Sequence, residues 1–258
     1  MVALSSSSER VAVNGVALIT GAGRGIGRAI ALALGRSGVD ISVGYRTNAS
    51  AASAVVAELE TMGRRAIALA GDVGEATVCG RLVEDTVARL GRIDILVANA
   101  GGASFAPFLS TDLETYELQL RTNARSSFLL AQAAARHMID QGEGGRIIFV
   151  TSEAADLAVE GMATYCASKA AQKMIMKCAA VELAPHGITV NAVAPGTIET
   201  DVNRDLLADA EMRTVLLGRV LLDHRGTPDD VADAAIYLAG AAHVTGSTIS
   251  VNGGSLML

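Results

Sequence analysis

The stretch VALITGAGRGIG (residues 16–27) decides the fold. Residues 16–20 are apolar and β-branched, which is typical of a buried strand, and the glycine-rich run TGAGRGIG (20–27) follows without a break. A helical pattern, GRAIALALGRSG (27–38), begins where the glycines end and stops at Gly38. Such a turn presents backbone N–H groups and the positive end of a helix to a phosphate. The segment therefore predicts a strand–loop–helix unit that binds a phosphorylated ligand.

Beyond this segment, short β-branched runs alternate with longer helical patterns. Further strands are predicted at residues 40–45, 66–70, 93–99, 146–152, 188–195 and 247–251. Helices are predicted in a stretch that ends at Gly63 and at residues 76–90, 112–140, 162–184 and 228–239. This alternation predicts one α/β domain over residues 1–258, a Rossmann-type doubly wound parallel sheet of about seven strands with helices on both faces. In that setting the glycine-rich loop favours a dinucleotide ligand.

The composition argues against several other classes of protein. The formal net charge is −6 and the arginines are dispersed, which disfavours a nucleic-acid partner. Cys79, Cys166 and Cys178 are odd in number and lack C-x-x-C spacing, and the four histidines are scattered, so neither a disulfide framework nor a metal site is predicted. The N-terminus lacks a signal-peptide pattern, and no apolar run approaches the ~20 residues of a membrane span. We therefore expect a cytoplasmic protein.

The stretch ATYCASKAA (163–171) places Tyr165 four residues before Lys169 in a helix-forming run. At this spacing the two side chains share a helix face. A phenol with its ordinary pKa near ~10 is a poor acid or base at neutral pH, but a neighbouring ammonium stabilises the phenolate. Taken alone, the pair is more often part of an ordinary amphipathic helix. It is also a candidate general acid and base.

The glycine spacing (Gly21, Gly25, Gly27) and Tyr165-x-x-x-Lys169 together resemble the short-chain dehydrogenase/reductase family. The stretches PGTIETDV (195–202) and GTPDDVADAAIYLAG (226–240) look most like its 3-oxoacyl-carrier-protein reductase branch. The resemblance covers nearly the whole chain. Further family motifs match in the right order: GDV (71–73), NAG (99–101), PGTIET (195–200) and VNGG (251–254). Several ordered matches make a catalytic role for the Tyr165–Lys169 pair the better interpretation.

Two more catalytic positions follow from the resemblance. Ser152 lies thirteen residues before Tyr165, where the family has its catalytic serine, and Asn123 matches the family's helix asparagine. The chain departs from the family at Ala98, where a second asparagine is common, and at Asn252, which replaces an aspartate.

The resemblance also implies a role for each catalytic residue. Tyr165 exchanges a proton with the substrate oxygen while a hydride moves to or from the nicotinamide ring. Lys169 lowers the pKa of Tyr165 and bonds the nicotinamide ribose, and Ser152 holds the substrate oxygen. Asn123 positions a water that links Lys169 to solvent. The protein supplies orientation and charge, and the cofactor supplies the redox chemistry.

The end of the second strand predicts which nicotinamide cofactor is used. Asp40 lies at a suitable distance beyond the glycines, but it precedes its strand, whereas dinucleotides bind outside the carboxyl ends. Tyr45 and Arg46 stand at that carboxyl end. Arg46, joined by Arg24, can grip a 2′-phosphate with charge-assisted hydrogen bonds. We therefore predict NADP(H).

The predicted cofactor contacts come from the glycine loop, the ends of four later strands and the catalytic helix. They are Gly21, Arg24, Gly25, Ile26, Gly27, Tyr45, Arg46, Asp72, Val73, Asn99, Ala100, Gly101, Tyr165, Lys169, Pro195, Gly196, Ile198 and Thr200.

The substrate is less sharply indicated. The resemblance favours a 3-oxoacyl-carrier-protein reductase, but Glu143 and His186 stand where that branch uses basic residues to dock its acidic carrier, so such a partner would be repelled. The alternative is a small free ketone, a diketone or a sugar alcohol, as in glucose dehydrogenases. A non-enzymatic NADP-binding sensor on the same fold is a further alternative. The direction and stereochemistry of the reaction are left open.

Two further expectations concern the surface. Residues 197–226 lack a clear period, and between Asp201 and His224 charges alternate with Leu and Val, which predicts an amphipathic flap over the substrate. The helices predicted at 112–140 and 162–184 carry Ala-rich apolar faces. These faces, with the family resemblance, predict a homotetramer.

Overall fold

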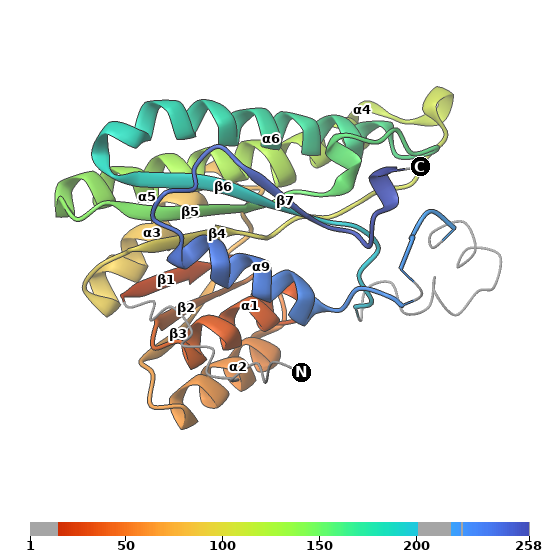
Figure 1. Ribbon diagram of the computed structural model, residues 1–258. Coiled ribbons are helices and arrows are strands. Elements are labelled where there is room, and N and C mark those ends of the chain that lie inside the picture. The colour runs from red at the N-terminus through yellow and green to blue at the C-terminus, as the bar shows by residue number, and fades with distance from the viewer. Residues whose placement is uncertain (1–14, 201–217, 223, 258) are drawn as a thin grey trace, which may run out of the picture.

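Figure 1 shows the computed structural model, which describes residues 15–200, 218–222 and 224–257. Within these residues one parallel sheet has the strand order β3-β2-β1-β4-β5-β6-β7. The strands are β1 (Val16–Ile19), β2 (Asp40–Tyr45), β3 (Ala66–Ala70), β4 (Ile95–Ala98), β5 (Gly145–Val150), β6 (Ile188–Pro195) and β7 (Thr248–Val251). The predicted doubly wound parallel sheet of about seven strands is confirmed.

Helices cover both faces of the sheet (Figure 1). One layer contains α1 (Gly25–Arg36), α2 (Ala49–Thr61) and α9 (Pro228–Gly240), and the other contains α3 (Ala76–Leu90), α5 (Ser126–Gln141) and α6 (Ala163–Leu183). The described helices include no segment with the length and apolarity that a bilayer crossing requires.

Each face of the sheet has its own hydrophobic core. Successive residues of a strand point to opposite faces, so Ala17 and Ile19 pack under α1 and α9, while Leu18 packs under α3 and α5. All three are fully buried. Burial on both faces explains why the strands are continuous apolar runs rather than alternating patterns.

The strand order places the candidate site. β1 pairs with β2 on one side and with β4 on the other, so the chain winds outward in both directions from β1. Ligands of such sheets bind in the crevice outside the carboxyl ends, where the winding reverses. The glycine-rich loop follows β1 and therefore lies at this crevice.

The helix predicted over residues 112–140 is not one regular helix. It comprises α4 (Leu113–Gln119), a π-helical turn η2 (Leu120–Arg125) and α5. Such turns are rare in proteins, and those that occur often lie at functional sites. This one contains Asn123, whose side chain bonds to residues of two distant segments. The helical period of the sequence cannot predict these contacts.

The predicted flap is described in part. Its residues 201–217 and 223 lie outside the described residues, so the interpretation of that stretch as a flap is not tested. Ile198 forms an isolated parallel bridge with Gly226, and Arg225 donates to Glu199 at 2.9 Å. These contacts tie the two ends of the segment together.

Candidate active site

The glycine-rich loop after β1 is shaped for close approach to a ligand. Gly21 and Gly25 have φ values of +67° and +54°, a region that glycine adopts readily and other residues rarely. A Cβ atom on Gly27 would lie 2.4 Å from the carbonyl oxygen of Gly21 and 2.6 Å from Nδ2 of Asn99. Helix α1 begins at Gly25, and the first N–H groups of a helix have no partner within it. The loop is therefore a cradle with unused donors, which suits a phosphate.

Asn99 holds the glycine loop against the end of β4. Its side-chain amide donates to the carbonyl oxygen of Thr20 at 2.8 Å. In return, Oγ1 of Thr20 accepts from the backbone N–H groups of Asn99 at 3.1 Å and Ala100 at 3.0 Å. These bonds lock the loop after β1 to the loop after β4.

The carboxyl end of β2 carries Tyr45 and Arg46, as expected. The Arg46 guanidinium is 65% exposed and lies 3.9 Å from the carboxylate of Asp72, which follows β3. A contact of this length on the surface contributes little, so Arg46 can turn to another anion. Asp40 is the first residue of β2, at the opposite end of the strand, and forms an ion pair with Arg65 at 2.7 Å. Asp40 therefore lies at the edge of the sheet opposite the glycine loop, as expected, and its exclusion from the cofactor site stays a prediction.

The other predicted cofactor residues gather at the same edge of the sheet. Asp72 and Val73 follow β3, residues 99–101 follow β4, and Pro195 to Thr200 lie at and beyond the end of β6. A Cβ on Gly25 would lie 3.6 Å from Cγ2 of Thr200, so the glycine loop and the end of β6 face each other. Parallel strands explain this convergence, because their carboxyl ends share one edge.

The Ser152 hydroxyl acts on the Tyr165 phenol and favours its ionised form. Ser152 follows β5 and accepts from the N–H of Ala154 at 3.1 Å, which leaves its hydroxyl proton for the phenol oxygen. Burial raises the pKa of Tyr165, and the nearby Ser152 hydroxyl acts in the opposite direction. Tyr165 therefore keeps its proton at neutral pH and is available as an acid.

Lys169 lies beside Tyr165 but is deeply buried, with 4% of its surface exposed. Its Nζ is 5.8 Å from the centre of the Tyr165 ring and donates to the carbonyl oxygen of Val150 at 2.9 Å and to Oε1 of Gln172 at 3.0 Å. Burial lowers the pKa of Lys169 to about 7. The expectation that Lys169 lowers the pKa of Tyr165 is not met in this structure, because burial dominates at both groups.

Asn123 completes the cluster from the π-helical turn. Its Oδ1 accepts from the N–H of Gly102 at 3.0 Å, and its Nδ2 donates to the carbonyl of Gly102 at 3.0 Å and to Oγ of Ser168 at 2.9 Å. A Cβ on Gly101 would lie 2.6 Å from Oδ1 of Asn123 and 3.6 Å from Nζ of Lys169. Asn123 and Lys169 therefore flank Gly101, and all four predicted catalytic residues are brought together.

The sequence interpretation missed two buried polar residues of this cluster, Ser127 and Gln172. Nε2 of Gln172 donates to Oγ of Ser127 at 2.7 Å, and Gln172 also accepts from Lys169. Their spacing in the sequence would have allowed both to be predicted. Gln172 comes three residues after Lys169 and Ser127 four residues after Asn123, so each shares a helix face with a predicted catalytic residue.

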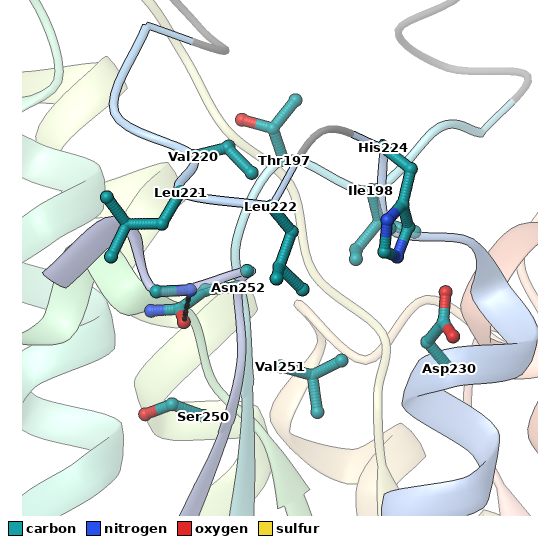
Figure 2. Close-up of a pocket in the computed structure, with 13 residues that line it drawn as sticks. Thr197, Ile198, Val220, Leu221, Leu222, His224, Asp230, Ser250, Val251 and Asn252 are labelled. Carbon is teal, nitrogen blue, oxygen red and sulfur yellow. Dashed lines mark hydrogen bonds between the residues drawn. The ribbon is translucent and has the colours of Figure 1, made fainter.

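A cavity of about 460 Å³ opens beside the end of β6 (Figure 2). Its lining is largely apolar and includes Ile198, Leu222 and Val251, with His224 and Asp230 at one side. The backbone N–H groups of Leu221 and Leu222 donate to the carbonyl of Gly253, which ties the end of the predicted flap to the chain after β7. The cavity adjoins the predicted nicotinamide segment, but its lining does not include the four catalytic candidates.

Comparison with known proteins agrees with this geometry. The family model for short chain dehydrogenases matches residues 15–211. An L-rhamnose 1-dehydrogenase (NAD(P)(+)) of a Sphingomonas species is 38% identical over 239 residues, covering 92% of this chain and 94% of that protein. A 3-oxoacyl-[acyl-carrier-protein] reductase of a Synechocystis species is 40% identical over 245 residues, covering 94% and 97%. The crystal structure of a short chain dehydrogenase from Burkholderia cenocepacia in complex with NADP has a TM-score of 0.89 at 36% identity, covering 96% and 100%.

Proposed function

The chain belongs to the short-chain dehydrogenase/reductase family, and from this premise we propose that it is an NADP(H)-dependent oxidoreductase that acts on a carbonyl or secondary alcohol. One observation carries the proposal. The Tyr165 phenol is acted on by the Ser152 hydroxyl and has the Lys169 amine 5.8 Å from its ring centre, at the crevice where the glycine loop lies. An acid, a polar partner for the substrate oxygen and a cation therefore meet beside a dinucleotide cradle.

The residues present fit a nicotinamide dinucleotide. Because Gly27 has no Cβ, α1 can pack closely against the loop, and the left-handed backbone at Gly21 and Gly25 turns the loop tightly. A pyrophosphate can therefore lie against the start of α1. Arg24 and Arg46 would hold a 2′-phosphate, Asp72 and Val73 the adenine, and Lys169 the nicotinamide ribose. When bound, the cofactor supplies or accepts the hydride.

The chain's own residues would manage the proton and the substrate oxygen. In the reduction direction Tyr165 gives its phenol proton to the oxygen that becomes the hydroxyl, and Ser152 orients that oxygen. The raised pKa of Tyr165 suits this direction, because the proton is present at neutral pH. Lys169 supplies positive charge near the phenolate that forms, and Asn123 holds the loop at Gly102 that borders the site.

The proposed preference for NADP(H) rests on Arg46. Arg46→Asp should lower kcat/KM with NADPH about tenfold or more, since it removes a charge-assisted partner of the 2′-phosphate, while kcat/KM with NADH should not fall. Arg65→Ala is the control, because Arg65 is 62% exposed and lies at the other end of the same strand pair. Steady-state kinetics with both cofactors measure this. A wild-type kcat/KM that is higher with NADH than with NADPH contradicts the assignment.

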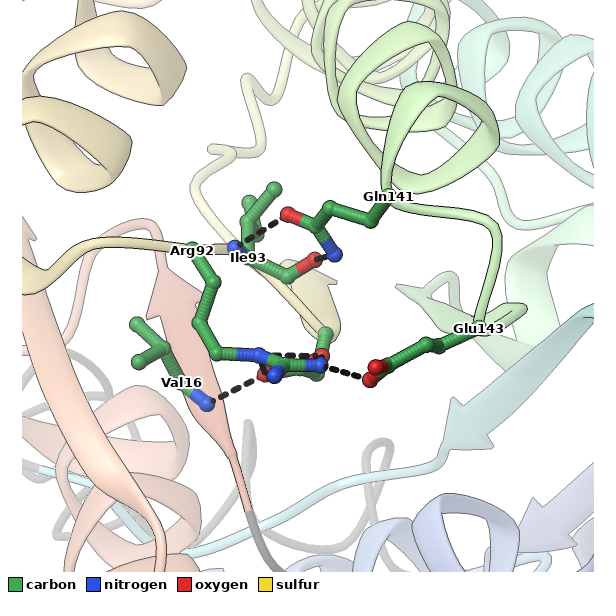
Figure 3. A network of polar contacts seen from close by, with 6 residues as sticks. Val16, Arg92, Ile93, Gln141 and Glu143 are labelled. Carbon is green, nitrogen blue, oxygen red and sulfur yellow. Dashed lines mark hydrogen bonds and ion pairs between the residues drawn. The ribbon is translucent and has the colours of Figure 1, made fainter.

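For the substrate we propose a 3-oxoacyl thioester, with a small free ketone, a diketone or a sugar as the alternative. The relatives include a reductase of the first class and a sugar dehydrogenase. Glu143, expected to repel an acidic carrier protein, is paired with Arg92, which donates to it at 2.5 Å and also to Asp94 (Figure 3). Arg92 holds the pKa of Glu143 below its usual range, so the group stays anionic. With its charge offset by Arg92, Glu143 repels a carrier less than the sequence suggested.

A cofactor-oxidation screen tests the proposed function. NADPH and NADH should be offered with carrier-bound and free 3-oxoacyl thioesters, diketones and quinones, and NADP⁺ and NAD⁺ with sugars including L-rhamnose. The proposal expects the thioesters to be reduced with NADPH. Turnover of sugars or free ketones alone supports the alternative substrate. Tight NADPH binding without any turnover would instead support a sensor.

We also propose a homotetramer. Large apolar side chains are exposed on and around α4, α5 and α6, including Phe108 (79%), Leu109 (98%) and Val181 (77%). Exposed apolar surface of this extent usually marks an interface. Light scattering at micromolar concentration should give four times the chain mass of 26.4 kDa, and a strict monomer contradicts the assembly.

A further inference from the structure

A chain of hydrogen bonds between buried residues runs from Lys169 to the backbone of the π-helical turn. Nζ of Lys169 donates to Oε1 of Gln172 at 3.0 Å, Nε2 of Gln172 donates to Oγ of Ser127 at 2.7 Å, and Ser127 donates to the carbonyl oxygen of Asn123 at 2.8 Å. Gln172 and Asn123 are fully buried, and Ser127 is 1% exposed. Protein side chains therefore join the backbone carbonyl of Asn123 to the amine of Lys169.

The backbone carbonyl of Asn123, at one end of this series of hydrogen bonds, fixes the direction of every bond in it. A backbone carbonyl only accepts, so Ser127 uses its single proton on the carbonyl of Asn123. Ser127 must then accept from its other neighbour, and the amide nitrogen of Gln172 is the donor. The amide oxygen of Gln172 consequently faces Lys169. Ser127 thus fixes the orientation of the Gln172 amide, which could otherwise be reversed.

This orientation matters for the charge on Lys169. An ammonium has three donors, and the described residues provide two acceptors for them, the carbonyl of Val150 and Oε1 of Gln172. Burial disfavours the ammonium, and a hydrogen bond to the charged form opposes this penalty. A reversed amide would place an NH₂ group against the amine and remove that support.

We propose that Gln172, oriented by Ser127, is a positioning residue that holds the amine of Lys169 beside Tyr165 and favours its ammonium form. This inference rests on the proposed function in so far as it gives Lys169 its role at Tyr165. Because a carboxamide keeps its protons at neutral pH, the chain holds Lys169 and does not conduct protons.

The surroundings of Lys169 make the effect measurable. On β5 it bonds the carbonyl of Val150. On α5 Ser127 lies behind Gln172, and on η2 Asn123 lies on the other side of Gly101. None of these side chains ionises. Tyr165 is the titratable group in contact with Lys169 among the described residues, and Cys166 and Glu153 act on Tyr165 in turn. A change at Gln172 alone should therefore report on the bond to Lys169.

The chain has three lysines, Lys169, Lys173 and Lys177, so NMR of protein labelled with ¹³C at the lysine Cε carbons follows each amine through its titration. In the cofactor-free protein Gln172→Met, which keeps the length but lacks the acceptor, should lower the pKa of Lys169 by about one pH unit. Gln172→Glu, which places a carboxylate at the same atom, should raise it. Lys173 and Lys177 should not move.

Two adjacent serines supply the matched control. Ser126 and Ser127 are both 1% exposed, and each donates to the carbonyl four residues before it, but only Ser127 receives Gln172. Ser127→Ala should shift the pKa of Lys169 downward, by less than Gln172→Met, and Ser126→Ala should leave it unchanged. An unchanged pKa in Gln172→Met, shifts of the same sign in Gln172→Met and Gln172→Glu, or equal shifts in the two serine variants each overturn the inference.

The same variants separate this inference from the proposed function. The NMR titration needs neither cofactor nor turnover, so it decides the Gln172–Lys169 link even if no substrate is reduced. If the enzyme is active, the pH at which kcat/KM falls on the alkaline side should move down in Gln172→Met by the shift seen for Lys169. An unmoved kinetic limb in the presence of the NMR shift contradicts the role at Tyr165.

Discussion

Replacing Tyr165 with phenylalanine is expected to lower kcat by about 10²–10⁴-fold while the Kd for NADPH stays nearly unchanged. Phenylalanine keeps the ring against which Lys169 lies and removes only the phenol oxygen, the atom on which Ser152 acts and which exchanges the proton. Steady-state kinetics on any substrate found in the screen, together with a fluorescence titration of NADPH, measure the two quantities.

Tyr237→Phe is the control for Tyr165→Phe. Tyr237 lies on α9 with 57% of its surface exposed, and it is not among the residues around Lys169, so its loss should change neither quantity. Full turnover in Tyr165→Phe contradicts the assignment of Tyr165 as the acid. A loss of NADPH affinity equal to the loss of kcat means that the variant damages the cofactor site, and this also contradicts the expected separation.

The parts of the fold and site that the sequence predicts are those that depend on local pattern. Alternating strands and helices predict the parallel sheet, and the sheet then brings Arg46, Ser152 and Thr200 to one edge although they are far apart in the chain. The four-residue spacing of Tyr165 and Lys169 predicts that they share a helix face, as they do at 5.8 Å. These inferences need only the periods of strands and helices and the direction of parallel strands.

The parts that the sequence does not predict depend on contacts between distant segments. The π-helical turn at Asn123 forms where that side chain bonds Gly102 and Ser168. Arg92 meets Glu143, which is 51 residues later in the chain. The lysine amine meets Val150 of β5, 19 residues earlier. No pattern within a helix or strand specifies such pairs.

The pKa values of the catalytic pair show the same limit. A tyrosine beside a lysine suggests a lowered phenol pKa. This holds where the phenolate and the ammonium are both exposed to water. Lys169 is buried and Tyr165 is half-buried here, and loss of water disfavours the charged form of each, so it raises the pKa of Tyr165 and lowers that of Lys169. Burial depth is a property of the folded structure. It reverses the sign of the expectation drawn from spacing.

The burial of Lys169 has a consequence for the stability of the cofactor-free protein. Its pKa is about 7 in the folded state, against an ordinary value of 10.5. Between these two values the unfolded chain binds a proton that the folded protein does not, so the free energy of unfolding rises with pH across this window. Below pH 7 the lysine is charged in both states, and the full cost of burying the ammonium is present.

Lys169→Met should abolish this dependence. From pH 6.5 to pH 9.5 the free energy of unfolding of the wild type should gain about 3 kcal/mol relative to that of Lys169→Met. The absolute stability of the variant is a separate matter, since methionine leaves the acceptors on Val150 and Gln172 without their donor. The expected result is therefore the difference in slope between the two proteins, which those lost bonds do not affect.

Urea denaturation at one fixed protein concentration, repeated across that pH range, measures the difference. The upper limit of pH 9.5 stays below the ordinary pKa of 10.0 from which burial raises Tyr165. Other groups that titrate in the window, such as the Cys79 thiol, whose pKa burial raises to about 11, are common to both proteins and cancel in the comparison. Lys177→Met, at an exposed position of the same helix, should follow the wild-type curve. Parallel curves for the wild type and Lys169→Met would mean that the amine keeps its ordinary pKa when folded, and that its burial does not govern its charge.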